Sequence, residues 1–134
     1  MTSSLSDPVR AFLAEPHFAV LATIGADGVP QQTVMWYLLD GDEILFNTKA
    51  GRAKERYLRA DPRVSLLIGG AYQYARVTGR VHEQRDHDAA QADIRRLAVR
   101  YTGEAAAVES MARFGLEERI TYRMPIERVY LYGF

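Results

Sequence analysis

Short runs of strand-forming residues, separated by tight-turn signals, are the feature that most constrains the fold of this chain. The first run is HFAVLATIG, and Asp27-Gly28 follows it as a hairpin-turn signal. Val29 to Leu39 form the second run, Asp40-Gly41 the second turn, and EILFNT the third run. Because strands joined by such turns pair antiparallel, we predict an antiparallel meander over this part of the chain.

Helix signals and further strand-forming runs lie on either side of this meander. Ser6 or Asp7 can cap a first helix with Pro8 at its first position, and Pro16 ends that helix. We predict further helices over residues 52–60, from Asp86 or Asp88 to Gly103, and over residues 104–114, and further strands over residues 64–68, 72–81, 120–123 and 128–132. Short, mostly sequential strands with a few helices favour a closed or split β-barrel, and periodicity alone leaves other compact β-rich folds open.

Length and composition indicate one domain over residues 1–134. Hydrophobic residues make up 48% and charged residues 25% of the chain, which are ordinary values for a globular protein. A chain of this size can bury a core, with little to spare. We therefore expect a cleft large enough for a cofactor to need a second copy of the chain.

Charge, cysteine content and the N-terminus argue against several classes of protein. Lysine plus arginine (17) balance aspartate plus glutamate (17), which argues against bulk electrostatic binding to nucleic acid or to a membrane. The absence of cysteine excludes disulfides, thiolate nucleophiles, zinc–thiolate sites and cysteine-bound iron–sulfur clusters. The start MTSSLSDPVRAFLAEP lacks the pattern of a signal peptide, and no apolar stretch is long enough to span a membrane. We therefore expect a cytoplasmic protein.

The segment NTKAGRAKERYLRADPR, residues 47–63, carries the clearest chemical signal. A strand ends at Thr48, the chain turns at Gly51 and a helix begins, so unpaired N–H groups and the helix dipole favour an anion there. Arg52 and Lys54 in the first turn complete a candidate phosphate cradle with the Thr48 hydroxyl. A basic helix face in water would show the same spacing, so both interpretations stay open. The sequence has neither a GxGxxG nor a GxxxxGK[ST] loop.

Other chemically reactive residues do not form a recognisable site. The residues that resemble metal ligands are His82, Glu83, Asp86, His87 and Asp88. An acidic helix start explains Asp86 and Asp88 without a metal, so we assign no metal site. His17 has no matched acid, base or nucleophile, and we assign no catalytic residue. Trp36, in a strand between Val34 and Leu38, is more typical of a core position than of a cofactor-facing one.

Three motifs, taken with their order and spacing, resemble those of the pyridoxamine 5′-phosphate oxidase-like split-barrel superfamily. They are LATIGADGVPQ in the first hairpin, FNTKAGRAK after the third strand and LRADPRVSLL leading into the fourth. The resemblance runs from about Phe12 to Val81, returns weakly in the last strands and is strongest to the branch of F420-dependent oxidoreductases. It implies a mainly β fold with flanking helices, in which antiparallel strands form a split β-barrel of the FMN-binding type.

The resemblance also implies where a cofactor binds. The strand-to-helix segment matches the part of the family that holds the cofactor phosphate, and the second strand lines the tricyclic ring. The cleft lies between the two protomers of a homodimer, so tyrosines at the start of the fifth strand would reach the cleft from the partner chain. The implied cofactor-binding residues are Thr33, Val34, Met35, Trp36, Thr48, Lys49, Arg52, Ala53, Lys54, Tyr72 and Tyr74.

The function implied by the resemblance is that of an oxidoreductase. It would transfer hydride between reduced F420 and a small organic substrate that the sequence does not identify. F420 is a 5-deazaflavin with an acidic oligoglutamate tail, which Arg56 and Arg59 would meet. The alternatives are an FMN-binding oxidoreductase of the same superfamily and a non-catalytic flavin or F420 carrier. The C-terminal PIERVYLYGF does not match the segment with which pyridoxamine phosphate oxidases proper grip pyridoxal phosphate, which argues against vitamin B6 oxidation.

Overall fold

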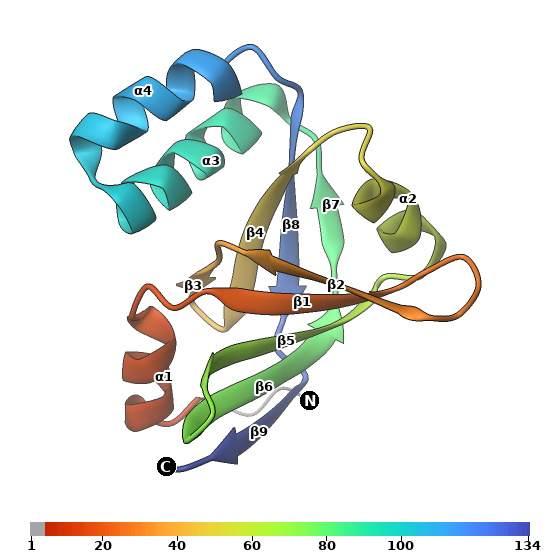
Figure 1. The fold of residues 1–134 in the computed structure, drawn as a ribbon, viewed down its shortest axis with the longest axis vertical. Helices are drawn as coiled ribbons and strands as arrows, with labels where there is room; N and C mark the ends of the chain where they lie inside the picture. Colours follow the sequence, from red (N-terminus) through yellow and green to blue (C-terminus); the bar gives the residue numbers. More distant parts are fainter. Residues whose placement is uncertain (1–4) are drawn as a thin grey trace.

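Two antiparallel sheets and four helices make up the computed structural model, which describes residues 5–134 (Figure 1). The helices are α1 (Asp7–Ala14), α2 (Ala53–Ala60), α3 (His87–Thr102) and α4 (Glu104–Phe114). The strands are β1 (Ala19–Ile24), β2 (Pro30–Met35), β3 (Leu38–Asp40), β4 (Glu43–Lys49), β5 (Arg63–Gly70), β6 (Gln73–Arg80), β7 (His82–Gln84), β8 (Arg119–Pro125) and β9 (Arg128–Tyr132). One sheet has the order β2-β1-β5-β6-β9 and the other the order β3-β4-β8-β7.

The main core lies between the two sheets. Leu21 of β1 and Leu66 of β5 are opposite each other in the ladder and face inward from the first sheet. Phe46 of β4 and Tyr122 of β8 face inward from the second sheet, and their rings stack with centroids 5.2 Å apart. All four side chains are fully buried. The two curved sheets around one core, with helices beside them, form the predicted split β-barrel (Figure 1).

A second core fills the space between the four-stranded sheet and helices α3 and α4. It contains Leu45 from β4, Leu97 from α3, and Ala107 and Phe114 from α4. Because β4 is covered by the barrel core on one face and by α3 on the other, residues 44–48 are all buried. No helix within residues 5–134 combines the length and the apolar character needed to cross a membrane.

The single strand predicted over residues 29–39 is two strands in different sheets, so this prediction and the continuous meander are wrong. β2 pairs with β1, whereas β3 pairs with β4. Between them, the N–H of Tyr37 donates to the hydroxyl of Tyr101 at 3.2 Å, and the C=O of Tyr37 accepts from Arg100 Nε at 3.0 Å. The backbone of Tyr37 is thus bonded to side chains of α3 instead of a neighbouring strand, and the chain changes sheet there.

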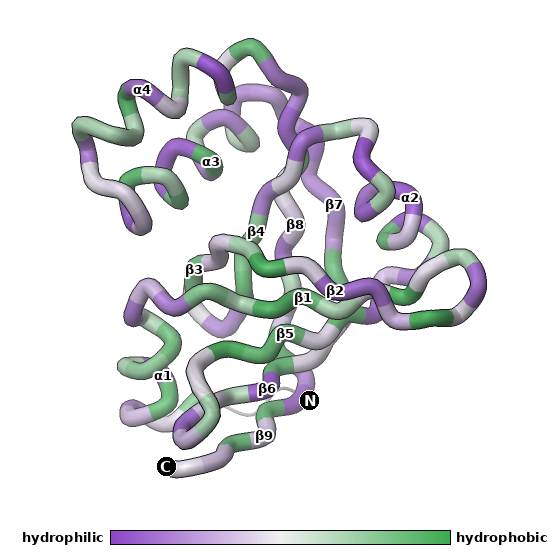
Figure 2. The backbone as a smooth tube through the Cα atoms, in the orientation of Figure 1, coloured by the Kyte–Doolittle hydropathy of each residue, from purple (hydrophilic) through white to green (hydrophobic). Residues whose placement is uncertain are grey.

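The strand predicted over residues 72–81 is confirmed as β6, and a further short strand, β7, follows directly after it. β6 stays in the first sheet, and β7 crosses into the second sheet, where it pairs with β8. At the break, the N–H of Val81 donates to the C=O of Pro62 at 2.9 Å. The three residues of β7 are hydrophilic (Figure 2). Only their pairing with β8 makes these three residues a strand. The sequence pattern therefore did not predict β7.

Arg100 of α3 joins three parts of the fold. Its guanidinium donates to the C=O groups of Ala14 and Glu15 at 2.7 Å each, at the end of α1. The last carbonyls of a helix lack partners within the helix, so Arg100 satisfies them. The same side chain donates to the C=O of Tyr37 at the sheet crossing. Through Arg100, α3 holds both α1 and the connection between β2 and β3.

Candidate functional site

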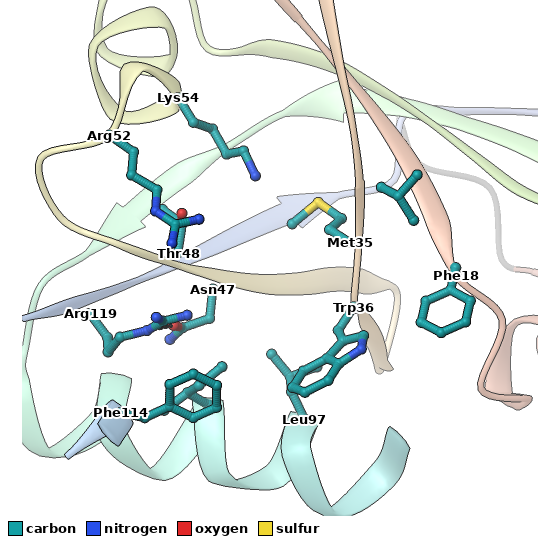
Figure 3. A pocket seen from close by; sticks show the side chains of 12 residues that line it. Phe18, Met35, Trp36, Asn47, Thr48, Arg52, Lys54, Leu97, Phe114 and Arg119 are labelled. Atoms are coloured by element: carbon teal, nitrogen blue, oxygen red, sulfur yellow. Dashed lines mark hydrogen bonds between the residues drawn. The ribbon is translucent and has the colours of Figure 1, made fainter. Parts of the chain in front are cut away.

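The candidate site is a pocket at the junction of β2, β4, α2 and the α3–α4 hairpin (Figure 3). Its volume is about 260 Å³. The side chains that line it are Phe18, Val34, Met35, Trp36, Asn47, Thr48, Arg52, Lys54, Ile94, Leu97, Phe114 and Arg119. These residues come from segments far apart in the sequence, so the tertiary fold assembles the pocket.

One side of the pocket is apolar and largely aromatic. The ring of Trp36 stacks on that of Tyr101 from α3, with centroids 5.4 Å apart and an interplanar angle of 6°. Phe18 also stacks on Tyr101, at 5.5 Å. Phe18 and Val34 line the pocket although they are 59% and 69% exposed. These side chains offer an apolar surface against which a flat ring can pack.

The other side of the pocket carries three cations. Arg52 and Lys54 at the start of α2, and Arg119 at the start of β8, point into the pocket (Figure 3). Burial, followed by the nearby charges of Arg52 and Arg119, lowers the pKa of Lys54. Arg119 pairs with Glu117, whereas neither Arg52 nor Lys54 has an ion-pair partner within residues 5–134. Three neighbouring cations, two of them without such a partner, favour an anionic ligand.

Backbone groups at the start of α2 are less available than the sequence predicted. Gly51 has a φ of 90°, which glycine adopts without strain, and this lets the chain turn from β4 into α2. The N–H of Gly51 donates to Glu55 Oε1 at 2.7 Å. This bond, helped by the charges of Arg85 and Arg59, lowers the pKa of Glu55. A carboxylate of the helix itself thus occupies part of the predicted cradle, and the side-chain cations remain as the candidate groups for binding an anion.

The structure brings six of the predicted cofactor-binding residues together in this pocket. They are Val34, Met35, Trp36, Thr48, Arg52 and Lys54. Thr33 on β2 and Ala53 in the first turn of α2 lie beside the pocket without lining it. Lys49 also does not line the pocket, and its Nζ lies 3.7 Å from Glu117 Oε2.

The two predicted tyrosines lie elsewhere, around the turn between β5 and β6. Tyr72 is 89% exposed. Tyr74 lines a second groove, of about 600 Å³, on the outer face of the five-stranded sheet. Neither side chain lines the candidate pocket of its own chain. A role for them at this site therefore requires a second copy of the chain.

Acidic residues near β7 are bound by arginines instead of being grouped around a metal. Glu83 pairs with Arg59 at 3.0 Å and with Arg85. Asp86 caps the N-terminus of α3. Among residues 5–134, no three histidine, aspartate or glutamate side chains are arranged to hold a metal ion. Both arginines expected to meet an acidic tail are exposed, but Arg59 pairs with Glu55 and Glu83, whereas Arg56 has no ion-pair partner within residues 5–134.

Asn47 and Arg119 are pocket residues that the sequence did not single out. Arg119 is 8% exposed, and its Nε donates to Asn47 Oδ1 at 2.9 Å. Burial lowers the pKa of Arg119, while the bond to Glu117 raises it. A polar residue inside the run EILFNT was the only local signal for Asn47. Arg119 gave no local signal, because its partner Asn47 is 72 residues away in the sequence.

Comparison with known proteins identifies the family. The family model described as pyridoxamine 5′-phosphate oxidase matches residues 5–132. The chain belongs to this family. It is 38% identical over 80 residues to a pyridoxine/pyridoxamine 5′-phosphate oxidase of Kineococcus radiotolerans, and 35% identical over 82 residues to one of Aeromonas hydrophila. These matches cover 58% and 59% of this chain but only 36% and 39% of the two relatives.

Solved structures of similar fold cover nearly the whole of this pyridoxamine 5′-phosphate oxidase family member. An F420 reductase aligns with a TM-score of 0.76 at 24% identity, over 94% of this chain and 98% of that one. A conserved hypothetical protein of Mycobacterium tuberculosis aligns with a TM-score of 0.81 at 28% identity, over 96% and 84% of the two chains. These likenesses confirm the split-barrel fold. The family belongs to a superfamily of flavin-binding oxidoreductases.

Proposed function

We propose that this family member is an oxidoreductase that binds F420 in the candidate pocket and moves hydride between the reduced cofactor and a small organic substrate. The observation that carries the proposal is that Arg52 and Lys54 face the same pocket as the aromatic side chain of Trp36. A ligand that joins an anionic group to a flat ring would satisfy both sides of this pocket. Flavins and deazaflavins with a phosphate-bearing chain have this chemistry.

The residues of the chain would bind and orient the cofactor. Arg52 and Lys54 would bind its phosphate with charge-assisted hydrogen bonds, and Thr48 would add a hydroxyl. Val34 to Trp36 would pack against the ring, with a backbone contribution from Thr33. The bound deazaflavin supplies the hydride chemistry. The protein therefore needs no acid–base set of its own and must position the ring and exclude water from it.

The outer face of the five-stranded sheet supports the second part of the proposal, which is that the protein works as a homodimer. The ladder aligns Val34, Val20, Leu67, Arg76 and Tyr130 in one row across this face. Most of this row is apolar and partly or fully exposed in a single chain. A second copy packed here would remove that apolar surface from water. It would also bring the tyrosines of the β5–β6 turn close to the pocket of its partner.

One observation of this chain favours F420 over FMN, although FMN suits the same phosphate-binding cations. Arg56 adds an exposed cation on α2, where an acidic cofactor tail would extend. An FMN-dependent oxidoreductase is the second candidate, favoured by the identity with the pyridoxine/pyridoxamine 5′-phosphate oxidases.

Equilibrium titration of the purified protein with F420 and with FMN, followed by fluorescence, tests the choice of cofactor. We expect F420 to bind more tightly. FMN binding tenfold tighter than F420, a difference of about 1.4 kcal/mol, would reverse the assignment. A protein that binds F420 tightly but exchanges no hydride with a panel of small acceptors would be a carrier.

A further inference from the structure

A buried chain of hydrogen bonds connects the pocket to α3. Arg119 Nε donates to Asn47 Oδ1 at 2.9 Å, and Asn47 Nδ2 donates to Thr121 Oγ1 at 3.2 Å. Thr121 Oγ1 in turn donates to Asp93 Oδ2 at 2.7 Å. The four residues are between 0% and 8% exposed. Asn47 Nδ2 also donates to the C=O of Ala90 on α3 at 3.1 Å, so two bonds hold the amide that accepts from Arg119. The chain of bonds runs from a cation in the pocket wall to the buried carboxylate of Asp93.

This arrangement fixes the orientation of the Arg119 guanidinium. A buried cation is unfavourable unless its N–H groups are bonded. Asn47 accepts from Nε, Glu117 accepts from Nη1 at 2.9 Å, and the ring of Phe114 lies 4.9 Å from the guanidinium. In the part of the chain that the structure describes, Nη2 donates to no protein group. One side of the guanidinium is held, and the other is left for a ligand in the pocket.

We propose that Arg119 is an anion-binding residue of the cofactor pocket and that the rest of the hydrogen-bond chain positions it toward the cofactor phosphate. The inference rests on the proposed function, because it assumes that the phosphate binds beside the start of α2. The phosphate would then be contacted from two elements, α2 and β8. Asn47, Thr121 and Asp93 would be positioning residues, since they act on the ligand through Arg119.

The charges in the pocket agree with an anion shared by three cations. Arg52 and Arg119 both lower the pKa of Lys54, in addition to its burial. Arg52 also lowers the pKa of Arg119. The three cations therefore lie close enough together to disfavour one another's charged form. A single phosphate among them would relieve this repulsion. Glu117 does not, because it pairs with only one of the three cations, Arg119.

Two substitutions of Thr121, which does not line the pocket, test the positioning role. Thr121→Val keeps the shape and removes the hydroxyl that links Asn47 to Asp93, whereas Thr121→Ser keeps a hydroxyl. Binding is measured for FMN against riboflavin, and for F420 against its deazaflavin without the phosphate. We expect Thr121→Val to raise the Kd of the phosphate-bearing ligand about tenfold and to leave the phosphate-free ligand unchanged. Thr121→Ser should keep the parent affinity.

Two further variants complete the set. Arg119→Gln removes the guanidinium and should raise the Kd of the phosphate-bearing ligand roughly ten- to a hundredfold, which provides a readout even if Thr121→Val does not fold. Arg96 bonds to the other oxygen of the Asp93 carboxylate, with Nη1 at 3.4 Å from Oδ1, and lies outside the chain. Arg96→Ala therefore disturbs the same carboxylate and should leave both Kd values unchanged.

The outcomes separate this inference from the proposed function. Equal losses for phosphate-bearing and phosphate-free ligands would show that the chain only supports the fold, which overturns the inference. Unchanged binding in Arg119→Gln, with weaker phosphate-dependent binding in Arg52→Ala, would also overturn it and leave the proposed function standing. If Arg52→Ala, Lys54→Met and Arg119→Gln all bind the phosphate-bearing ligand as the parent does, the phosphate binds elsewhere and both proposals fail.

Discussion

Replacing Lys54 with methionine separates ligand binding from folding stability. Lys54 lies half-buried in the pocket, and its burial and the charges of Arg52 and Arg119 lower its pKa. A lowered pKa means that the charged lysine is less favourable in the folded chain than in the unfolded chain. Methionine has a similar length and no charge. We therefore expect the ligand-free Lys54→Met protein to be as stable as the parent or slightly more stable.

Ligand binding should change in the opposite direction. A charge-assisted hydrogen bond contributes about 1.5–3 kcal/mol, so Lys54→Met should raise the Kd of the phosphate-bearing cofactor roughly ten- to a hundredfold. The matched control is Lys49→Met, because Lys49 lies outside the pocket lining and faces Glu117 at 3.7 Å. An exposed ion pair of this kind contributes about 0–1 kcal/mol, so the control should bind the cofactor nearly as the parent does.

Calorimetric melting of the ligand-free proteins and fluorescence titration with the cofactor provide the two measurements. A melting temperature several degrees lower in Lys54→Met, with an unchanged Kd, would mean that this lysine supports the fold and does not bind the anion. Equal weakening of cofactor binding by Lys49→Met and Lys54→Met would mean that total charge determines affinity, and the geometry of the pocket would then not explain binding.

Three further variants test the surroundings of the site. The bond from the Gly51 N–H to Glu55 lowers the pKa of Glu55 in the folded chain. It therefore stabilises the folded chain fully above the ordinary pKa of 4.5, and this stabilisation is lost as pH falls through the lower pKa of the folded chain. Urea midpoints of Glu55→Gln should therefore vary less with pH in this acidic range than those of the parent. Tyr101→Phe removes the hydroxyl bonded to Tyr37 and should lower the free energy of unfolding by about 1–2 kcal/mol in urea titrations, and no loss would contradict the role given to this bond. Leu67→Arg should convert a dimer into a monomer in sedimentation velocity, and a parent that is monomeric at micromolar concentration would refute the homodimer.

The strands were predictable wherever the pattern that marks them is local. β1 alternates buried and half-buried residues, and the glycine of the Asp27-Gly28 turn adopts a φ of 82°. The stretch 29–39 was misread because its strand-forming residues continue across the point where the chain changes sheet. The groups that cause the change, Arg100 and Tyr101, lie more than sixty residues later, beyond the reach of any local pattern.

The residues of the candidate site were likewise predictable only where a local pattern marks them. Arg52 and Lys54 were predictable because a strand end, a turn and a helix start follow each other within a few residues. Lys49 belongs to the same segment, but its side chain faces Glu117, a residue 68 positions later in the sequence, instead of the pocket. Arg119 was missed because an arginine at a strand start is no local signal for a site. Only the tertiary fold brings its partner Asn47 next to it.

The α3–α4 hairpin stands to one side of the two sheets in Figure 1. Its Arg100 nevertheless bonds to the C=O of Glu15, 85 residues earlier, and to the C=O of Tyr37 at the sheet crossing. Contacts between residues so distant in sequence require a long loop to close, which costs chain entropy. Side chains of the hairpin therefore hold both the entry of the chain into the barrel and its passage between the sheets. A shortened protein without the hairpin would lose the bonds that tie α1 and the β2–β3 connection in place, and would expose Leu45 of β4.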